Sequence, residues 1–528
     1  MPVEKMRIFL ALLFIFAVGL ALRFNNLSGR SLWTDEFFTL FQSSGHGVDI
    51  VKLVDDLSKR DSPVLSKPGD FRLLLKNDPA RHIQDVTASL LETDTHPPLY
   101  FWIMHIWMRV FGDSAFALRF FSVLMGIFVI LLAYRIGERL FDQRTAIFCA
   151  LFAAISPFSV RYSQEARSYS LIMVIGLLSS LYLLRLERDN KDQDAFWFAV
   201  FTSLGFYTHY FYAFVALGHF IYFSIANRGQ GTKISKFCLA ILGSLLLFSP
   251  WFILVAVKGY NFRNTEWIFG YLGIFNKIGD IFRGMVRYVL IFDDPGLFPA
   301  LSFLAGLAFF VYIAFYGARG IFAKYRRQLW FCLSIFILPL ASMLFLDIAE
   351  HAALLRQERF WVFSFLGFIP LAGYFLSLGF SRNKTVTSML ILLMLASSFL
   401  VSSVQFGPAP EKICRWINKR SQGKSSVVFA CNVRGVLPAQ SYYLEDDVYL
   451  LPVSDAGQLT DSVKLAAVLF DRIFIVRHYH RADNALMNGF FMEARDIGAP
   501  FRPGEEANMD DISAREFINY AHNHRKIP

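Results

Sequence analysis

Long uncharged apolar runs constrain this chain more than any other feature. The runs Ile8–Leu22 and Thr385–Val401 contain no Asp, Glu, Lys or Arg. With their flanks, such runs approach the roughly 20 residues that cross a hydrocarbon core of about 30 Å. Of the 528 residues, 55% are hydrophobic, which is more than the average soluble domain contains. We therefore predict a polytopic integral membrane protein built mainly of α-helices.

The apolar runs predict a transmembrane bundle of about eleven spans, whose ends carry an uncertainty of a few residues. The spans are placed at 6–22, 115–136, 145–161, 168–185, 195–208, 210–226, 236–257, 297–317, 329–347, 360–380 and 385–403.

Basic residues set the expected orientation, because Lys and Arg accumulate in cytoplasmic loops. They are concentrated in every second predicted loop, at Arg139, Arg144, Arg188, Lys191, Arg228, Lys233, Lys236, Arg319, Lys324, Arg326, Arg327, Arg382 and Lys384. This pattern predicts a cytoplasmic N-terminus and an extracytoplasmic C-terminus in the inner (plasma) membrane. It also accounts for much of the net charge of +10, so nucleic acid is not an expected partner.

Three segments do not fit as spans. Residues 25–114 form a long outer loop in which the apolar stretch 97–111 is too short to cross and is predicted to lie at the membrane face. Residues 258–298 favour a second interfacial helix.

The polar tail is expected to form a small α/β domain. We therefore predict a transmembrane catalytic domain over 1–403 and an extracytoplasmic domain over 404–528, with strands near 426–431, 448–453 and 472–476 and helices near 412–420 and 462–470.

Four charged clusters fall on the predicted outer side, where charges near a membrane are costly unless they are paired, solvated or functional. Asp35 and Glu36 offer two adjacent carboxylates. His96 precedes a Pro-Pro helix start, where N–H groups and an imidazole suit a phosphate. The other two clusters are 161–169, which contains Tyr162, Glu165, Arg167 and Tyr169, and 356–360, which contains Arg356 and Arg359. Arg suits phosphate oxygens because its planar fork can bond two of them at once.

Each cluster also has a plain structural reading. For Asp35 and Glu36 that reading is a solvated loop, for His96 a capped interfacial helix, and for the two Arg clusters local ion pairs. The convergence of all four on one face is the stronger argument, because carboxylates, an imidazole and excess Arg suit one site for an anionic lipid head group and a polar acceptor.

These motifs resemble, in order and spacing, those of the bacterial GT-C glycosyltransferases. The quoted stretches are Ser31–Glu36, Thr95–Tyr100, Phe111–Ser114 with Ala117–Arg119, and Tyr162–Tyr169. The resemblance covers about residues 1–230 and is nearest to the dolichyl-phosphate-mannose–protein mannosyltransferase, aminoarabinose transferase and lipopolysaccharide-core galacturonosyltransferase group. Arg359 and Phe360 are similar to a later Arg-Tyr motif of that group, with Phe in place of Tyr.

The resemblance implies inverting transfer of a sugar from a polyprenyl-phosphate donor to an envelope glycan, lipid or protein acceptor at the outer face. It implies that Asp35 is the catalytic base, that Glu36 and Glu165 position acceptor or sugar, and that His96, Arg167 and Arg359 bind the phosphate. At the place of His96 the aminoarabinose transferases have Lys, so the charge at this position is smaller at neutral pH. The predicted binding residues are His96, Tyr162, Glu165, Arg167, Tyr169, Arg356 and Arg359.

Other points stay open at the level of sequence. A transporter or flippase of polyprenyl-linked lipids and a polymerase or ligase with a diphosphate-linked donor are the alternatives. No cofactor is implied with certainty, no metal ligand set is evident, and the resemblance leaves a divalent metal open. The sugar, the acceptor, the oligomeric state, the role of the tail and a disulfide between Cys414 and Cys431 are not determined by the sequence.

Overall fold

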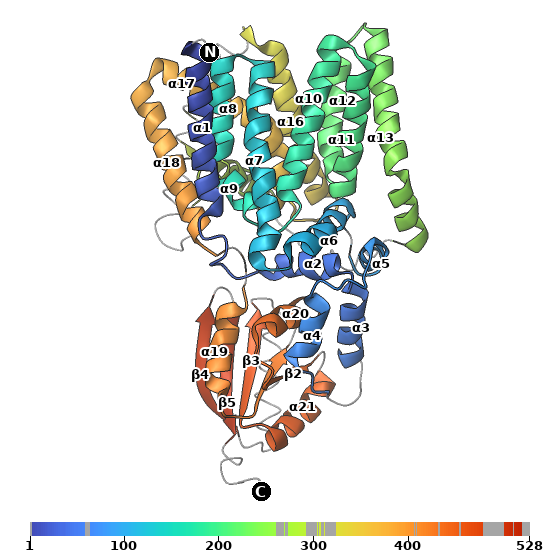
Figure 1. Ribbon diagram of the computed structural model, residues 1–528, viewed down its shortest axis with the longest axis vertical. Coiled ribbons are helices and arrows are strands. Elements are labelled where there is room, and N and C mark those ends of the chain that lie inside the picture. The colour runs from blue at the N-terminus through green and yellow to red at the C-terminus, as the bar shows by residue number, and fades with distance from the viewer. Residues whose placement is uncertain are drawn as a thin grey trace. The chain divides into compact units, whose positions relative to one another are not determined.

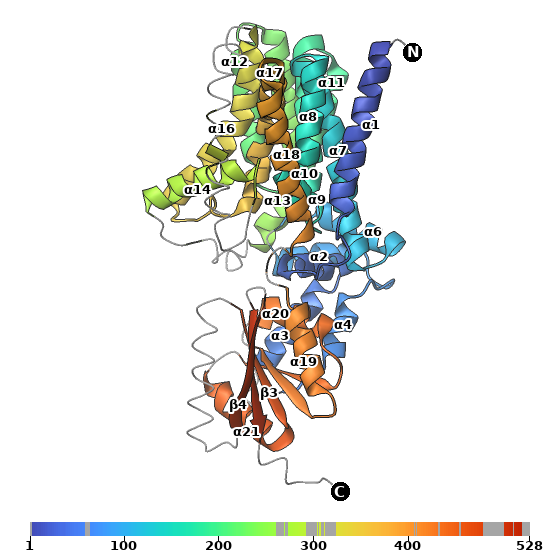
Figure 2. The ribbon, with the colours of Figure 1, turned by 90° about the vertical axis from the view of Figure 1, so that its left-hand side faces the viewer.

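The computed structural model divides the chain into two compact units (Figures 1 and 2). The membrane unit contains Met1–Leu27, Asp94–Tyr100 and Phe116–Val404, and the tail unit contains Ser28–Thr93, Phe101–Ala115 and Gln405–Pro528. The structure describes residues 3–58, 64–94, 96–259, 269, 273–291, 304, 306–307, 311, 324–405, 407, 409–430, 433–453, 456–478, 501–509 and 512–519.

Helices make up the described part of the membrane unit, and the long ones stand side by side (Figure 1). They are α1 (Val3–Phe24), α7 (Ala115–Leu140), α8 (Gln143–Ile155), α9 (Pro157–Ser163), α10 (Tyr169–Asp189), α11 (Asp192–Thr208), α12 (Tyr212–Ala226), α13 (Gly231–Lys258), α14 (Ile274–Arg287), α16 (Arg326–Ala349), the 3₁₀ helix η2 (Glu358–Trp361), α17 (Val362–Arg382) and α18 (Lys384–Ser403). The predicted helical membrane bundle is confirmed.

The predicted count of about eleven spans is not confirmed. Seven described helices are long and apolar enough to cross a membrane, or eight if α8 and α9, which meet at 57°, form one broken span. The helices α11 and α12, with 17 and 15 residues, fall short of the roughly 20 residues that a span needs. The span predicted at 297–317 lies largely outside the described residues.

The helix α14 has an inverted distribution of side chains and lies at a steep angle to the long helices (Figure 2). Its charged Lys277 and Asp280 are buried, whereas Phe275 and Ile278 are exposed by 86% and 55%. The Lys277 ammonium donates to the main-chain carbonyls of Asp347 and Ala352. The charged face of α14 is therefore held by protein, and its apolar face is open, as expected of a helix at a membrane surface.

The tail unit contains a five-stranded sheet in the order β2-β1-β3-β5-β4. Strands β1 (Ser426–Ala430), β2 (Val448–Pro452) and β3 (Arg472–His478) are parallel, and β5 (Ile512–Asn519) and β4 (Phe501–Met509) continue the sheet antiparallel. The three predicted strands are thus present, and β4 and β5 were not foreseen. The helices of this sheet are α19 (Glu411–Ser421), α20 (Val433–Tyr443) and α21 (Ala456–Leu469).

The segment 28–93 folds together with this sheet. It forms α2 (Thr34–Ser44), α3 (Gly47–Ser58), α4 (Pro68–Leu75) and α5 (Ile83–Thr93), and most of α6 (Leu99–Phe111) belongs to the same unit. Ser66 forms an antiparallel bridge with Leu450 of β2, and Arg72 forms an ion pair with Asp446. The loop that separates the first two predicted spans is therefore part of the same compact unit as the tail.

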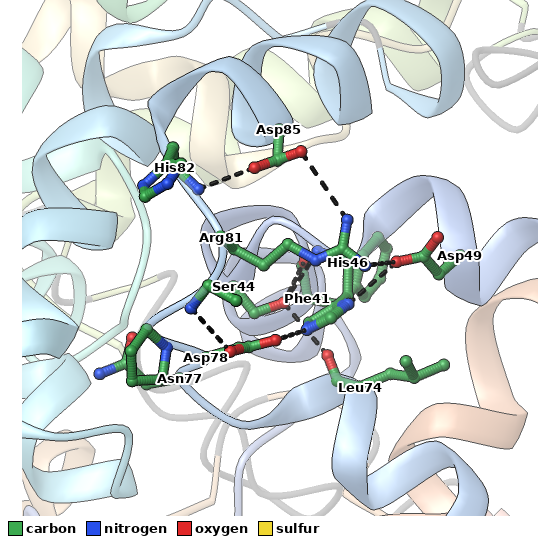
Figure 3. Close-up of polar contacts among 12 residues, drawn as sticks. Phe41, Ser44, His46, Asp49, Leu74, Asn77, Asp78, Arg81, His82 and Asp85 are labelled. Carbon is green, nitrogen blue, oxygen red and sulfur yellow. Dashed lines mark hydrogen bonds and ion pairs between the residues drawn. The ribbon is translucent and has the colours of Figure 1, made fainter.

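His46 contacts carboxylates from two parts of this segment, one in α3 and one between α4 and α5 (Figure 3). The two ring nitrogens of His46 lie 2.9 Å from a carboxylate oxygen of Asp49 and 3.3 Å from one of Asp78. Arg81 lies 2.6 Å from Asp49 and 3.7 Å from Asp85. The Ala80 N–H, which donates to Asp78, and the nearby His46 hold the pKa of Asp78 below its ordinary value.

Candidate active site

Arg23 fixes the broken helix that carries the first part of the site. It is fully buried near the end of α1 and donates to the main-chain carbonyls of Ala153 and Ala154 at 2.9 Å, where α8 ends. It also donates to the side-chain oxygens of Ser159 and Ser163 on α9, at 3.0 and 3.1 Å. The last carbonyls of a helix lack partners within it, and a cation is favoured there. Arg23 therefore holds α8 and α9 at their bend.

Gln164 fixes the turn that follows α9. Its side-chain amide donates to the carbonyls of Leu22, Arg23 and Asn25, at 3.1, 3.0 and 2.9 Å, and so satisfies the end of α1. The next residue, Glu165, is 3% exposed, and its carbonyl accepts the Arg167 N–H at 2.7 Å. The turn between α9 and α10, which carries Glu165 and Arg167, is thus fixed to the end of α1.

Tyr162 and Tyr169 flank this turn and lie in the hydrophobic core of the membrane unit. Both are buried, and their rings meet edge to face with centroids 5.0 Å apart. The Ser170 hydroxyl donates to the Tyr162 carbonyl at 2.7 Å. These contacts give both rings a packing role, and their predicted role in binding substrate stays a prediction.

His96 and Arg167 are brought together from segments 71 residues apart. The His96 Nδ1 lies 2.6 Å from a carboxylate oxygen of Asp94, and the His96 Nε2 lies 3.3 Å from a guanidinium nitrogen of Arg167. The His96 side chain is 33% exposed and that of Asp94 is 9% exposed, whereas Arg167 is 5% exposed. A carboxylate, an imidazole and a guanidinium therefore form one row of contacts.

His209, between α11 and α12, lies beside this row. Its ring centroid is 6.1 Å from that of His96, and the rings of Phe360 and Phe363 lie 5.9 and 5.1 Å away. Burial lowers the pKa of His209 well below its ordinary value, and the positive charges of Arg167 and Arg359 lower it further. His209 is thus a neutral member of the group, and its only signal in the sequence is a histidine at an expected outer turn.

Arg359 completes the group that we call the basic cluster: His96, Arg167, His209 and Arg359. It is partly exposed in η2. The ring of the next residue, Phe360, lies 5.9 Å from that of His209, and the charge of Arg359 acts on His209.

The residues around Arg359 form ion pairs with distant segments instead of with one another. Glu358 lies 2.9 Å from Arg161 and also pairs with Arg287 at the end of α14. Arg356 lies 3.6 Å from Asp280 of α14 and is 50% exposed. Of the two arginines predicted at this motif, Arg359 therefore joins the basic cluster, whereas Arg356 has its carboxylate partner on α14.

Asp35 and Glu36 belong to the tail unit, in the first turn of α2. The Glu36 carboxylate accepts the Trp33 N–H at 3.2 Å, and Glu36 is 1% exposed. It thus satisfies a main-chain donor at the start of the helix, as a helix cap does. Asp35 is partly exposed.

The start of α2 is held by the C-terminal segment of the tail unit. The Leu32 N–H donates to the Tyr443 hydroxyl at 2.9 Å, and Gln405 donates to the Ser31 carbonyl at 3.1 Å. Gly407 has φ of +68°, and a Cβ there would lie 2.3 Å from the Trp33 ring. Only glycine fits both the backbone conformation and the space, so Trp33 and the helix that it precedes are closely packed.

No group of three or more His, Cys, Asp or Glu side chains in the described ranges could hold a metal ion. Cys414 is a buried free thiol, and Cys431 lies outside the described residues.

Comparison with known proteins agrees with this architecture. Residues 95–254 match the family described as dolichyl-phosphate-mannose-protein mannosyltransferase. The crystal structure of ArnT from Cupriavidus metallidurans in the apo state superposes with a TM-score of 0.55 at 13% identity, over 96% of this chain and 97% of that one. The chain has the GT-C fold. The fold class predicted from the sequence is thereby confirmed, and with its seven or eight apolar helices among the described residues the chain is a multi-pass membrane protein.

Two curated relatives match parts of the chain. An uncharacterized protein of Aquifex aeolicus is 24% identical over 258 residues, which are 47% of this chain and 48% of the relative. The putative mannosyltransferase YycA of Bacillus subtilis is 27% identical over 154 residues, which are 29% of this chain and 22% of that protein. The chain thus aligns with less than half the length of either relative. His96, Arg167 and His209 lie within the residues that match the family.

Proposed function

We propose that this protein is an inverting glycosyltransferase that moves a sugar from a polyprenyl-phosphate donor to an envelope glycan, lipid or protein acceptor. The observation that carries the proposal is the basic cluster, in which His96, Arg167 and His209 fall within the family match and Arg359 joins them from η2. Its two guanidinium groups suit the oxygens of a phosphate. The ArnT fold has also been solved bound to undecaprenyl phosphate, with a TM-score of 0.54 to this chain, which supports a polyprenyl carrier.

The proposed reaction exchanges one bond at the anomeric carbon. An acceptor hydroxyl or amine forms a bond to this carbon, the bond to the phosphate oxygen breaks, and the electron pair leaves with the polyprenyl phosphate. Arg167 and Arg359 would stabilise the negative charge that develops on the leaving oxygen. Such stabilisation by groups already in place is usually the largest part of catalysis.

We assign the acceptor proton to the carboxylate of Asp35, on the strength of the motif that contains it. A base of this kind contributes about 10²- to 10⁴-fold in rate. Glu36 would act through the helix start that it caps, and Glu165, in the turn with Arg167, would orient a sugar hydroxyl or the Arg167 guanidinium.

The proposed topology follows the basic loops: the N-terminus is cytoplasmic, and residues 404–528 lie on the outer side of the inner membrane, where transfer occurs. The boundary at residue 403, where the chain passes from the last membrane helix to the tail, is part of this proposal, and segment 28–93 is grouped with the tail. The sugar and the acceptor are left to experiment.

A transfer assay on the purified full chain in detergent tests the proposal. A panel of polyprenyl-phosphate sugars would be offered with a crude envelope extract as acceptor, and wild type would be compared with Asp35→Asn and Arg167→Ala. We expect transfer by wild type and a loss of at least about a hundredfold in Asp35→Asn. Arg135→Ala is the matched control, because this exposed arginine pairs with Glu138 in the last turns of α7. Movement of intact lipid-linked sugar across proteoliposomes, without transfer, would replace the proposal with the transporter reading.

A further inference from the structure

The contacts of His96 determine where its proton lies. A guanidinium donates from all of its nitrogens and accepts at none. The His96 Nε2, 3.3 Å from Arg167, must therefore present its lone pair. The proton of the neutral ring is then on Nδ1, which donates to Asp94 at 2.6 Å. In this arrangement His96 carries no charge, and Asp94 holds it in a single tautomer.

We propose that binding of the donor phosphate is coupled to protonation of His96, with Asp94 as the positioning residue and Arg167 as the group that is released. This inference rests on the proposed function. When an anionic phosphate enters, Arg167 turns from the His96 Nε2 to the phosphate oxygens. The exposed Nε2 takes a proton from solvent, and the resulting imidazolium donates to Asp94 from Nδ1 and to the phosphate from Nε2.

Charges of both signs lie around His96. Arg167 lies 3.3 Å from Nε2, and the charge of Arg359 acts on the neighbouring His209, so two cations lie in this region. Asp94 favours the cation through Nδ1, and Glu165 lies in the same turn as Arg167. A bound phosphate changes this balance, because it neutralises the arginines and adds a partner for Nε2.

His209 does not compete for this proton. It is 8% exposed against 33% for the His96 side chain, and burial lowers its pKa well below the ordinary value. His96 is therefore the more solvent-accessible histidine of the basic cluster.

The test is the pH dependence of the affinity for a synthetic polyprenyl methyl phosphate. This diester keeps one negative charge between about pH 5.5 and 8.5, the range in which a histidine titrates. If binding takes up one proton, affinity rises as the pH falls, by up to about tenfold per pH unit. His96→Gln is expected to bind more weakly with a flat pH profile, and His96→Lys to bind tightly with a flat profile. Calorimetry in two buffers of different ionisation enthalpy should count one proton taken up by wild type and none by His96→Gln.

Asp94→Asn tests the positioning role without loss of the fold. The asparagine amide oxygen can still accept the main-chain N–H of His96, which Asp94 accepts at 3.2 Å. Loss of the carboxylate charge should move the rise in affinity to lower pH, which a purely structural role would not do. A pH slope in His96→Gln equal to that of wild type would overturn the inference. So would a flat profile in wild type that binds the diester well, although the proposed function would then stand. Failure of well-folded wild type to bind the diester at any pH would overturn both.

Discussion

Arg23 donates a hydrogen bond of 2.9 Å to the carbonyl oxygen of Ala153, which lies 130 residues further along the chain, and a second of the same length to that of Ala154. The arginine closes the end of α8 and holds α9, on which the turn with Glu165 and Arg167 depends. Its buried charge thus belongs to the scaffold of the site.

Replacement of Arg23 by Met should destabilise the membrane unit, because several main-chain carbonyls and two serine hydroxyls would lose their donor. A buried acceptor that is left without its donor costs about 1–3 kcal/mol. We expect a marked fall in the midpoint of thermal unfolding in detergent, followed by tryptophan fluorescence. Arg135→Met, at an exposed arginine, should remain near wild type. Equal midpoints for the two variants would show that Arg23 does not support the bend.

Replacement of His46 by Gln should weaken the tail unit, because Gln cannot bond both Asp49 and Asp78 in the same geometry. The expected loss is about 1 kcal/mol per hydrogen bond. Exchange of main-chain hydrogens in residues 76–82 and in the first turn of α3 should become faster. Unchanged exchange in both segments would contradict the prediction.

Acid should weaken the same contact through Asp78. A carboxyl group whose pKa is lowered by folding contributes stability above its unfolded pKa of about 3.9, and this contribution is lost as the pH falls towards the folded pKa. The pKa of Asp78 is lowered, so exchange in residues 76–82 should speed up below about pH 4. In Asp78→Asn this part of the acid response should be absent.

Much of the membrane unit could be predicted because apolar runs report directly on burial in lipid. Four predicted spans coincide with long apolar helices of the structure, namely α1, α7, α10 and α13. The union of segment 28–93 with the tail could not be predicted, because it rests on contacts such as Ser66 with Leu450, which lie far apart in sequence.

The same limit applies to the site. The density of charge in the motifs pointed to His96 and Arg167, but their contact depends on the packing of separate helices. Local pairing of Glu358 with Arg356 or Arg359 was a reasonable expectation, yet Glu358 reaches Arg161, 197 residues away. His209 had no charge pattern around it, and only tertiary structure places it beside His96.

Asp35→Asn and Glu36→Gln should differ in kind, although the two residues are neighbours. Asp35→Asn should lose transfer while its thermal midpoint stays near that of wild type, since Asp35 is partly exposed and Glu36 supplies the cap. Glu36→Gln should retain part of the activity and lose about 1 kcal/mol of stability, as expected when a cap is weakened. Transfer rates and midpoints measured on the same preparations distinguish the two. Full activity of folded Asp35→Asn would remove it as the base.

Arg359→Ala and Arg356→Ala should likewise separate, three residues apart in one motif. Arg359 belongs to the basic cluster, and loss of a hydrogen bond to a charged group costs about 1.5–3 kcal/mol, or roughly 10- to 100-fold in donor affinity. Arg356 is half exposed and pairs with Asp280, so its replacement should change donor affinity by less than about threefold, as weak exposed ion pairs do. Titration of both variants with a polyprenyl-phosphate sugar makes the comparison. A larger loss in Arg356→Ala than in Arg359→Ala would mean that the donor phosphate lies nearer to α14 than to His209, and Asp280→Asn, which removes the partner of Arg356, would then be expected to strengthen donor binding.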